Sequence, residues 1–359
     1  MKNQVFRVKM IAMLLAVALL TAACGGAQGT GKSVTPAETK APAAAAEAPK
    51  SLKKIKVGYL NVMDDAQAML AKDAGFYEKH GLDVELVLFS SGTDLIKALV
   101  GGQLQAGVLG FTNAVSWAAK GADLKIVGGA QMGYHSIVVK KGSGIKTVAD
   151  LKGKRLASQQ AGSTADIVLN GAVFPQAGLT RKDLTLVYVD PALAIQSLAA
   201  GQVDAAFVFE PYEQLAKATG DVEAIYEVGK VWPFPCMVVI TTGKALTEDR
   251  QAINKVLAAQ KEAIEMMQKD PAGSAKLIVK RFIQEEELTG PSGKVKAVDV
   301  IQQAIETQMF HWEITPDEVK RMEEIVEIMV AQGVLKEKVA IEPLLDLTWQ
   351  KSGAASHGH

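Results

Sequence analysis

The sequence is poor in cysteine. Its two cysteines, Cys24 and Cys236, are too few for a disulfide framework or for paired Cys-x-x-Cys zinc motifs. Net charge is also absent, because 39 basic residues balance 39 acidic ones, so we expect no nucleic-acid partner. The catalytic patterns HExxH and GxSxG do not occur. We therefore expect no enzyme activity, no metal site and no cofactor.

Long apolar runs are lacking as well, apart from a short one at the N-terminus. Met10–Leu20 is too short for an ordinary membrane-spanning helix, and it lies between basic and small residues as in an export signal. The basic residues are Lys2, Arg7 and Lys9. Thr21–Cys24 resembles a bacterial lipobox, in which the cysteine is lipidated. A plain signal peptide cut near Ala23 is the alternative.

These features predict an exported lipoprotein of the cell membrane that faces the periplasm or the cell exterior. Residues 1–23 form the predicted signal peptide. Residues 24–54 are rich in Ala, Gly, Pro, Ser and Lys without an apolar period, so they read as a flexible tether. The folded part is expected over 55–349, which is long enough for two ordinary domains. Residues 350–359 are predicted to be disordered.

A stretch of the folded part occurs twice. Asp94–Phe111 and Leu193–Glu210 share the same order of apolar residues, and a Gly-Gln pair stands at the same place in each. Each copy predicts a helix, a glycine turn at Gly102 or Gly201, and a short apolar strand. Two similar lobes would explain the duplication. Chance similarity between two ordinary helix–strand units is the alternative.

Strands and helices alternate along most of the chain, which predicts an α/β fold with parallel sheets and right-handed crossovers. Ligands of such sheets bind beyond the carboxyl ends of the strands. The loops expected there are rich in hydroxyl and amide groups and in helix N-termini, which favour negative charge without a fixed cation. This equipment suits the binding of a solute better than its conversion. His135 is more readily explained as a structural residue than as a base, and Cys236 as a small buried apolar residue.

Four motifs resemble a known family. They are the run Ala74–Leu82 (AGFYEKHGL), Gly101–Gly107 (GGQLQAG), Thr147–Lys154 (TVADLKGK) and Phe209–Tyr212 (FEPY). In this order they are similar to the substrate-binding proteins of ABC importers for aliphatic sulfonates, taurine, nitrate and thiamine-pyrimidine precursors. The resemblance covers roughly residues 55–240.

The resemblance implies a type II periplasmic-binding-protein fold, with a ligand cleft between two lobes. Lobe one would comprise 55–135 and 238–349, and lobe two 136–237. It further implies a monomeric receptor that delivers a small polar solute to an ABC transporter permease. The ligand-binding residues carried over by position are Asn61, Asp64, Ser90, Ser91, Thr93, Phe111, Thr112, Asn113, His135, Gln159, Gln160, Gly162, Ser163, Thr164, Asp190, Glu210 and Trp232. Ser91, Thr93, Ser163 and Asp190 could instead serve only as helix caps.

Glu210 is the most specific of these expectations. It ends a predicted strand, and the loops of the expected cleft carry no Lys or Arg to pair with it. A buried carboxylate needs a partner, so we expect it to accept a hydrogen bond from a ligand amine or ring N–H. A salt bridge to a distant basic residue and simple exposure are the alternatives.

Two other functions compete with a receptor. The same fold family includes a fungal enzyme that makes the thiamine pyrimidine, but that enzyme carries a cysteine-rich iron motif, whereas the folded part here has only Cys236. A sensor input domain would be expected to continue into a membrane or kinase segment after Trp349.

Overall fold

The computed structural model describes residues 52–354, which form one compact unit. The predicted signal peptide, the lipidation of Cys24, nearly all of the tether and the last five residues lie outside the described range. No helix in that range combines the length and the apolar character needed to cross a membrane.

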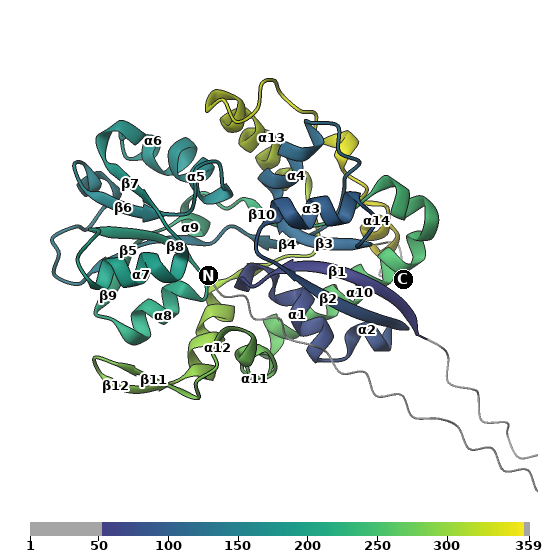
Figure 1. The fold of residues 1–359 in the computed structure, drawn as a ribbon, viewed down its shortest axis with the longest axis horizontal. Coiled ribbons are helices and arrows are strands. Elements are labelled where there is room, and N and C mark those ends of the chain that lie inside the picture. The colour runs from purple at the N-terminus through teal and green to yellow at the C-terminus, as the bar shows by residue number, and fades with distance from the viewer. Residues whose placement is uncertain (1–51, 355–359) are drawn as a thin grey trace, which may run out of the picture. The chain divides into compact units, whose positions relative to one another are not determined.

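Two β-sheets form the framework (Figure 1). The first sheet has the order β13-β4-β10-β3-β1-β2. Its strands are β1 (Lys53–Leu60), β2 (Leu82–Phe89), β3 (Ala106–Gly110), β4 (Lys125–Met132), β10 (Pro235–Thr241) and β13 (Met309–Phe310). The second sheet has the order β7-β6-β8-β5-β9. Its strands are β5 (His135–Lys140), β6 (Arg155–Ser158), β7 (Thr185–Tyr188), β8 (Ala205–Phe209) and β9 (Val222–Glu227).

The two sheets share one topology. Leaving β13 aside, β2-β1-β3-β10-β4 in the first sheet matches β7-β6-β8-β5-β9 in the second. The fourth strand is β10 in the first order and β5 in the second. Each is the first strand that the chain forms after it crosses from the other sheet. Both of these strands run antiparallel to their neighbours, so the expectation of purely parallel sheets is wrong. The reason is that each enters its sheet from the side of the other sheet, without a helical crossover.

The duplicated stretches form equivalent structures. The helix α3 (Gly92–Val100) leads to β3, and α7 (Pro191–Ala199) leads to β8. Gly102 and Gly201 adopt φ values of 75° and 72°, a left-handed conformation that favours glycine. In each turn the glutamine N–H donates back to a helix carbonyl, at 2.9 Å in the first copy and 2.8 Å in the second. The predicted helix–turn–strand units are therefore confirmed.

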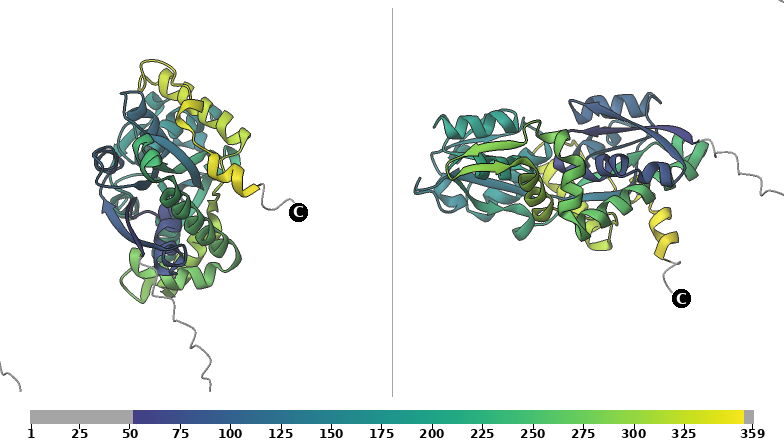
Figure 2. Two further views of the ribbon diagram at one scale, coloured as in Figure 1. Left: turned by 90° about the vertical axis from the view of Figure 1, so that its right-hand side faces the viewer. Right: turned by 90° about the horizontal axis from the view of Figure 1, so that it is seen from below.

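Helices cover the sheets, and the chain after β10 is mostly helical (Figure 2). The remaining α-helices are α1 (Ala66–Asp73), α2 (Phe76–Lys79), α4 (Phe111–Ala118), α5 (Thr164–Val168), α6 (Phe174–Gln176), α8 (Tyr212–Thr219), α9 (Val228–Val231), α10 (Gly243–Lys269), α11 (Pro271–Phe282), α12 (Ala297–Thr307), α13 (Pro316–Ala331) and α14 (Thr348–Ala354). A hairpin of β11 (Glu287–Gly290) and β12 (Gly293–Lys296) precedes α12, and short helical turns include η1 (Met63–Asp65).

Two local expectations need correction. The sequence predicts a single helix from Asp65 to Glu78, with Met69 and Leu70 facing inward, but Gly75 adopts φ 75° and separates α1 from α2. The predicted disorder from residue 350 is wrong as far as Ala354, because α14 continues to that residue. By contrast, Thr315-Pro316-Asp317-Glu318 has the spacing of a capping box, and the structure confirms it. The Thr315 hydroxyl accepts from the N–H of Glu318, and the Glu318 carboxylate accepts from the N–H of Thr315.

Candidate functional site

The chain crosses between the sheets along two neighbouring segments. One joins β4 to β5, and the other leads from α9 into β10. The N–H of Gly133 donates to the carbonyl of Phe234 at 2.6 Å, which ties the two segments together. A Cβ atom at Gly133 would lie 2.0 Å from the Phe234 ring, so only glycine fits there. Side chains next to these segments lie where both sheets can contribute to one site.

Three buried side chains meet beside the crossings: Asp64 from η1, His135 from the start of β5, and Cys236 from β10. Each has a potential ligand atom within 4.8 Å of the others. They are only 4%, 4% and 3% exposed. The imidazole is enclosed by aromatic rings, with Phe207 and Phe234 stacked on it and Phe209 edge-on. Cys236 is buried as expected, but it lies against polar groups.

Burial changes the protonation of this cluster. Desolvation, with a smaller contribution from the Glu210 carboxylate, raises the pKa of Asp64 to about 8. Desolvation lowers the pKa of His135 to about 4. At neutral pH the imidazole is therefore neutral and the Asp64 carboxyl is mostly protonated. The pKa of the Cys236 thiol is raised, chiefly by burial, so the thiol is also neutral.

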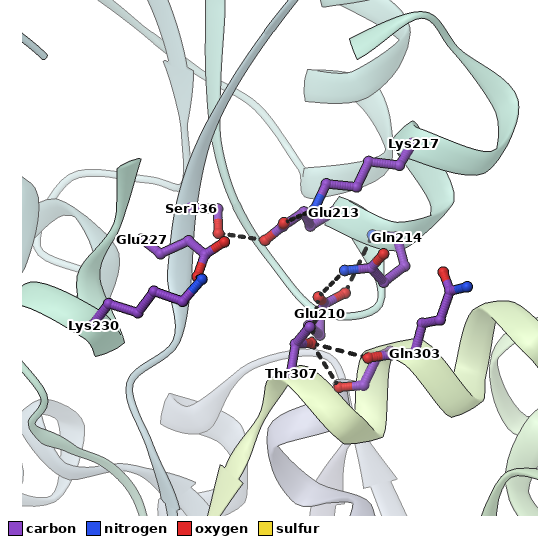
Figure 3. Close-up of polar contacts among 10 residues, drawn as sticks. Ser136, Glu210, Glu213, Gln214, Lys217, Glu227, Lys230, Gln303 and Thr307 are labelled. Atoms are coloured by element: carbon purple, nitrogen blue, oxygen red, sulfur yellow. Dashed lines mark hydrogen bonds and ion pairs between the residues drawn. The ribbon is translucent and has the colours of Figure 1, made fainter. Parts of the chain in front are cut away.

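Glu210 lies at the end of β8 and is 1% exposed. Its carboxylate accepts hydrogen bonds from the N–H of Gln214 (3.2 Å), the Gln214 side chain (2.9 Å) and the Thr307 hydroxyl (2.8 Å), as Figure 3 shows. Its backbone carbonyl accepts from the N–H of Met63 at 3.4 Å. Thr307 is the last residue of α12, so these contacts join the second sheet to α12 and η1.

The protein itself thus supplies partners for Glu210. No basic residue of the described range is paired with it, and it is not exposed, so both alternatives raised from the sequence fail. The argument that an unpartnered carboxylate needs a ligand N–H also loses its premise. Burial, followed by repulsion from Glu213, raises the pKa of Glu210 to about 7. Glu213 is itself paired with Lys217 and accepts from Ser136 (Figure 3).

A second group of predicted residues joins the two sheets through hydroxyl and amide groups. The hydroxyls of Thr112 in α4 and Thr164 in α5 are hydrogen-bonded at 2.6 Å. A Cβ atom at Gly110 would lie 2.9 Å from the Thr164 hydroxyl, and one at Gly92 would lie 2.6 Å from the Asn113 amide nitrogen. The N-termini of α3, α4 and α5 therefore converge. Phe111 is fully buried at this point.

Other predicted residues serve the local fold. Ser91 and Ser163 cap α3 and α5 by accepting from backbone N–H groups. Asp190 is the N-cap residue of α7, as expected, but its side chain accepts no capping hydrogen bond. Thr93 lies inside α3 and caps nothing.

The remaining predicted residues make no hydrogen bond between the two sheets at the converging helix N-termini, although Ser90 directly precedes the N-cap of α3 and Gly162 that of α5. Asn61 is exposed and donates to the carbonyl of Arg281, and Gln159 donates to that of Phe207. Trp232 stacks beneath Arg321 and lines a groove of about 440 Å³. Gly162 lines a separate groove of about 580 Å³. Two others, Ser90 and Gln160, are exposed.

Sequence reasoning missed three contributors. Gly92 and Gly110 allow the close approach of Asn113 and Thr164. In the sequence, only the position of each glycine, directly at a predicted helix start or strand end, could have indicated this role. Thr307 carried no signal, because it comes from the C-terminal part, where the family resemblance is loose.

Comparisons with known proteins agree on one family. A family model described as NMT1/THI5 like matches residues 63–274. The chain is 34% identical over 161 residues to the “Putative aliphatic sulfonates-binding protein” of Escherichia coli (strain K12). This alignment covers 44% of the chain and 50% of that protein.

Solved structures show the same architecture. The alkanesulfonate-binding protein SsuA from Xanthomonas axonopodis pv. citri, bound to MOPS, matches with a TM-score of 0.68 and 25% identity, covering 84% of this chain and 100% of that one. The periplasmic aliphatic sulphonate binding protein SsuA from Escherichia coli also matches with a TM-score of 0.68. Its identity is 24%, and the match covers 81% of this chain and 90% of that one, so it supports the fold alone.

Proposed function

The chain belongs to the NMT1/THI5-like family and has the periplasmic-binding-protein fold, and from this premise we propose that it is a receptor for a small polar solute. It captures the solute between its lobes and delivers it to an ABC importer. We assign lobe one to residues 55–135 and 238–349, and lobe two to 136–237. Hinge closure would occur about the two crossing segments.

The observation that carries this proposal is the convergence of α3, α4 and α5 from the two lobes. Thr112 and Thr164 bring hydroxyls together at 2.6 Å, and Asn113 lies beside the start of α3. Helix N-termini present backbone N–H groups and positive dipole ends, which suit an anionic group. A solute held here would contact both lobes and so favour closure.

We propose a sulfonate-type solute, the class that also includes taurine. Two observations favour it over an amine or heterocycle. The relatives named above bind alkanesulfonates or are named for doing so, and Glu210 has protein donors in place of a ligand N–H. Nitrate shares the negative charge and the three oxygens of a sulfonate but is planar, and the pyrimidine precursors serve as the heterocyclic comparison.

Titration calorimetry against taurine, alkylsulfonates, nitrate and pyrimidine precursors tests this proposal. We expect one sulfonate to bind best, and Thr112→Val and Thr164→Val each to weaken it at least about tenfold, which corresponds to about 1.4 kcal/mol. Thr247→Val is the matched control, because Thr247 is an exposed threonine in α10 whose hydroxyl donates to the carbonyl of Gly243 in the same helix. Equal effects from all three variants would reject this site, and tight binding only of a pyrimidine precursor would reject the solute class.

The anchor and the non-enzymatic role belong to the same proposal. Intact mass of membrane-extracted protein should show acyl groups on an N-terminal Cys24, whereas Cys24→Ala should leave the protein unmodified. A mature N-terminus at Cys24 without added acyl mass would refute lipidation.

Iron-dependent conversion of a substrate by the purified protein would show that it is an enzyme of the same fold family and not a receptor.

A further inference from the structure

The cluster of Asp64, His135 and Cys236 offers more than the proposed receptor needs. These three side chains come from separate elements and point potential ligand atoms at one place, within 4.8 Å of each other. They are distant in the sequence, so no spacing motif announces them. Their convergence depends on the side-by-side passage of the two crossing segments.

Two polar atoms in this cluster are buried without a hydrogen-bond partner. They are Oδ1 of Asp64 and Nδ1 of His135. Buried polar atoms in native proteins nearly always have partners, so each such atom calls for an explanation. A single bound cation would accept electron pairs from both residues at once. Both side chains are more than nine-tenths buried. The lack of hydrogen-bond partners therefore supports a bound ligand independently of the proximity of the three residues.

The donor set indicates which cation fits. Hard ions such as Mg²⁺ and Ca²⁺ prefer oxygen ligands alone. A thiolate, an imidazole nitrogen and a carboxylate oxygen together are typical of borderline ions, and of Zn²⁺ above all. We propose that Asp64, His135 and Cys236 bind one divalent transition-metal ion, with Zn²⁺ as the best fit. This revises the expectation from the sequence that the chain holds no metal.

The geometry permits such a site after small side-chain adjustments. Three atoms no more than 4.8 Å apart always fit within a circle with a radius of at most about 2.8 Å. Zinc bonds are about 2.0–2.3 Å long, so each ligand needs to move by less than about 1 Å. The rings of Phe207, Phe209 and Phe234 restrict access of water to the imidazole. Three protein ligands leave a fourth tetrahedral position open.

The test uses Co²⁺ as a spectroscopic probe and Zn²⁺ as its competitor. The protein is the full chain with Cys24→Ser, His357→Gln and His359→Gln, purified without a histidine tag, reduced and freed of metal by a chelator. Cys236 is then the only thiol in the chain. We expect one equivalent of Co²⁺ to produce a thiolate-to-metal charge-transfer band together with tetrahedral visible bands, and we expect Zn²⁺ to abolish both.

Variants then assign the ligands. Asp64→Asn and His135→Gln should each weaken Co²⁺ binding at least tenfold, while Cys236→Ser should remove the charge-transfer band. His311→Gln, a half-buried histidine paired with Glu318, is the matched control and should change nothing. Absence of saturable one-to-one binding, or of the thiolate band, would overturn the proposal even if a variant failed to fold. Solute calorimetry on the metal-free protein is scored separately, so this proposal and the receptor proposal can fail independently.

Discussion

Replacement of Thr307 by valine isolates the contact between α12 and the buried carboxylate of Glu210. Valine keeps the shape of threonine and removes its hydroxyl. That hydroxyl lies 2.8 Å from Glu210 and 3.1 Å from the carbonyls of Gln303 and Ala304. Because Glu210 is 1% exposed, water cannot easily replace the lost donor. We therefore expect the folded unit to lose stability.

The size of the loss depends on the charge of Glu210. A hydrogen bond to a charged group contributes about 1.5–3 kcal/mol, and one between neutral groups about 0.5–1.5 kcal/mol. The pKa of Glu210 is raised to about 7 by burial first and by Glu213 second. Thr307→Val should therefore cost about 1 kcal/mol more well above pH 7 than well below it. A raised carboxyl pKa also means that the folded state holds its proton more tightly, so stability falls as pH rises from about 4.5 to about 7.

Urea unfolding of the full chain at two pH values, one on each side of that pKa, measures these differences. Thr219→Val is the matched control, since its hydroxyl donates only to the carbonyl of Leu215 within α8. A double-mutant cycle with Glu210→Gln separates the charge-dependent part of the interaction. The reasoning is refuted if Thr307→Val costs no more than Thr219→Val at either pH. It also fails if the coupling to Glu210 is the same at both.

Three further outcomes are expected. Asp346→Asn should lower the free energy of unfolding by about 1 kcal/mol at neutral pH, because Arg250 lowers the pKa of Asp346 to about 2; this difference should disappear as pH falls from 3.8 towards 2 in urea titrations. A hydrogen bond from His311 to a carboxylate raises the pKa of His311, so thermal melts should show His311→Gln destabilising below pH 6.5 and nearly neutral at high pH. Gly110→Ala would place a methyl group 2.9 Å from the Thr164 hydroxyl, so calorimetry should show weaker solute binding, and unchanged affinity would contradict this site.

Local features of the fold could be predicted because their causes are local. The turns at Gly102 and Gly201 each require a left-handed residue after a helix, and glycine meets that requirement at little cost. The apolar strands that follow them are recognisable from composition alone. The direction of β5 and β10 could not be predicted, because it depends on partners that the chain reaches only after crossing to the other sheet.

The candidate site likewise contains residues that could be predicted from the sequence and residues that could not. Thr112 and Thr164 follow β3 and β6 closely, so their positions could be anticipated from the strand ends. Glu210 was correctly expected to be buried, but its partner Thr307 lies on a distant helix that no motif connects with it. Cys236 was predicted to be a small buried apolar residue because free cysteines are commonly buried. Its polar neighbours are a product of tertiary structure.

The exchange of strands between the sheets has a consequence for how the protein is made. In the first sheet, β10 lies between β3 and β4 and pairs with both, so the facing edges of those two strands stay unpaired until the chain has reached Thr241. A nascent chain that has emerged only as far as β9 can complete the second sheet, because β5 to β9 are all present. It cannot complete the first, although most of that sheet was synthesised earlier. The half of the protein that begins first therefore finishes last, and its strand edges stay available to other partners in the interval.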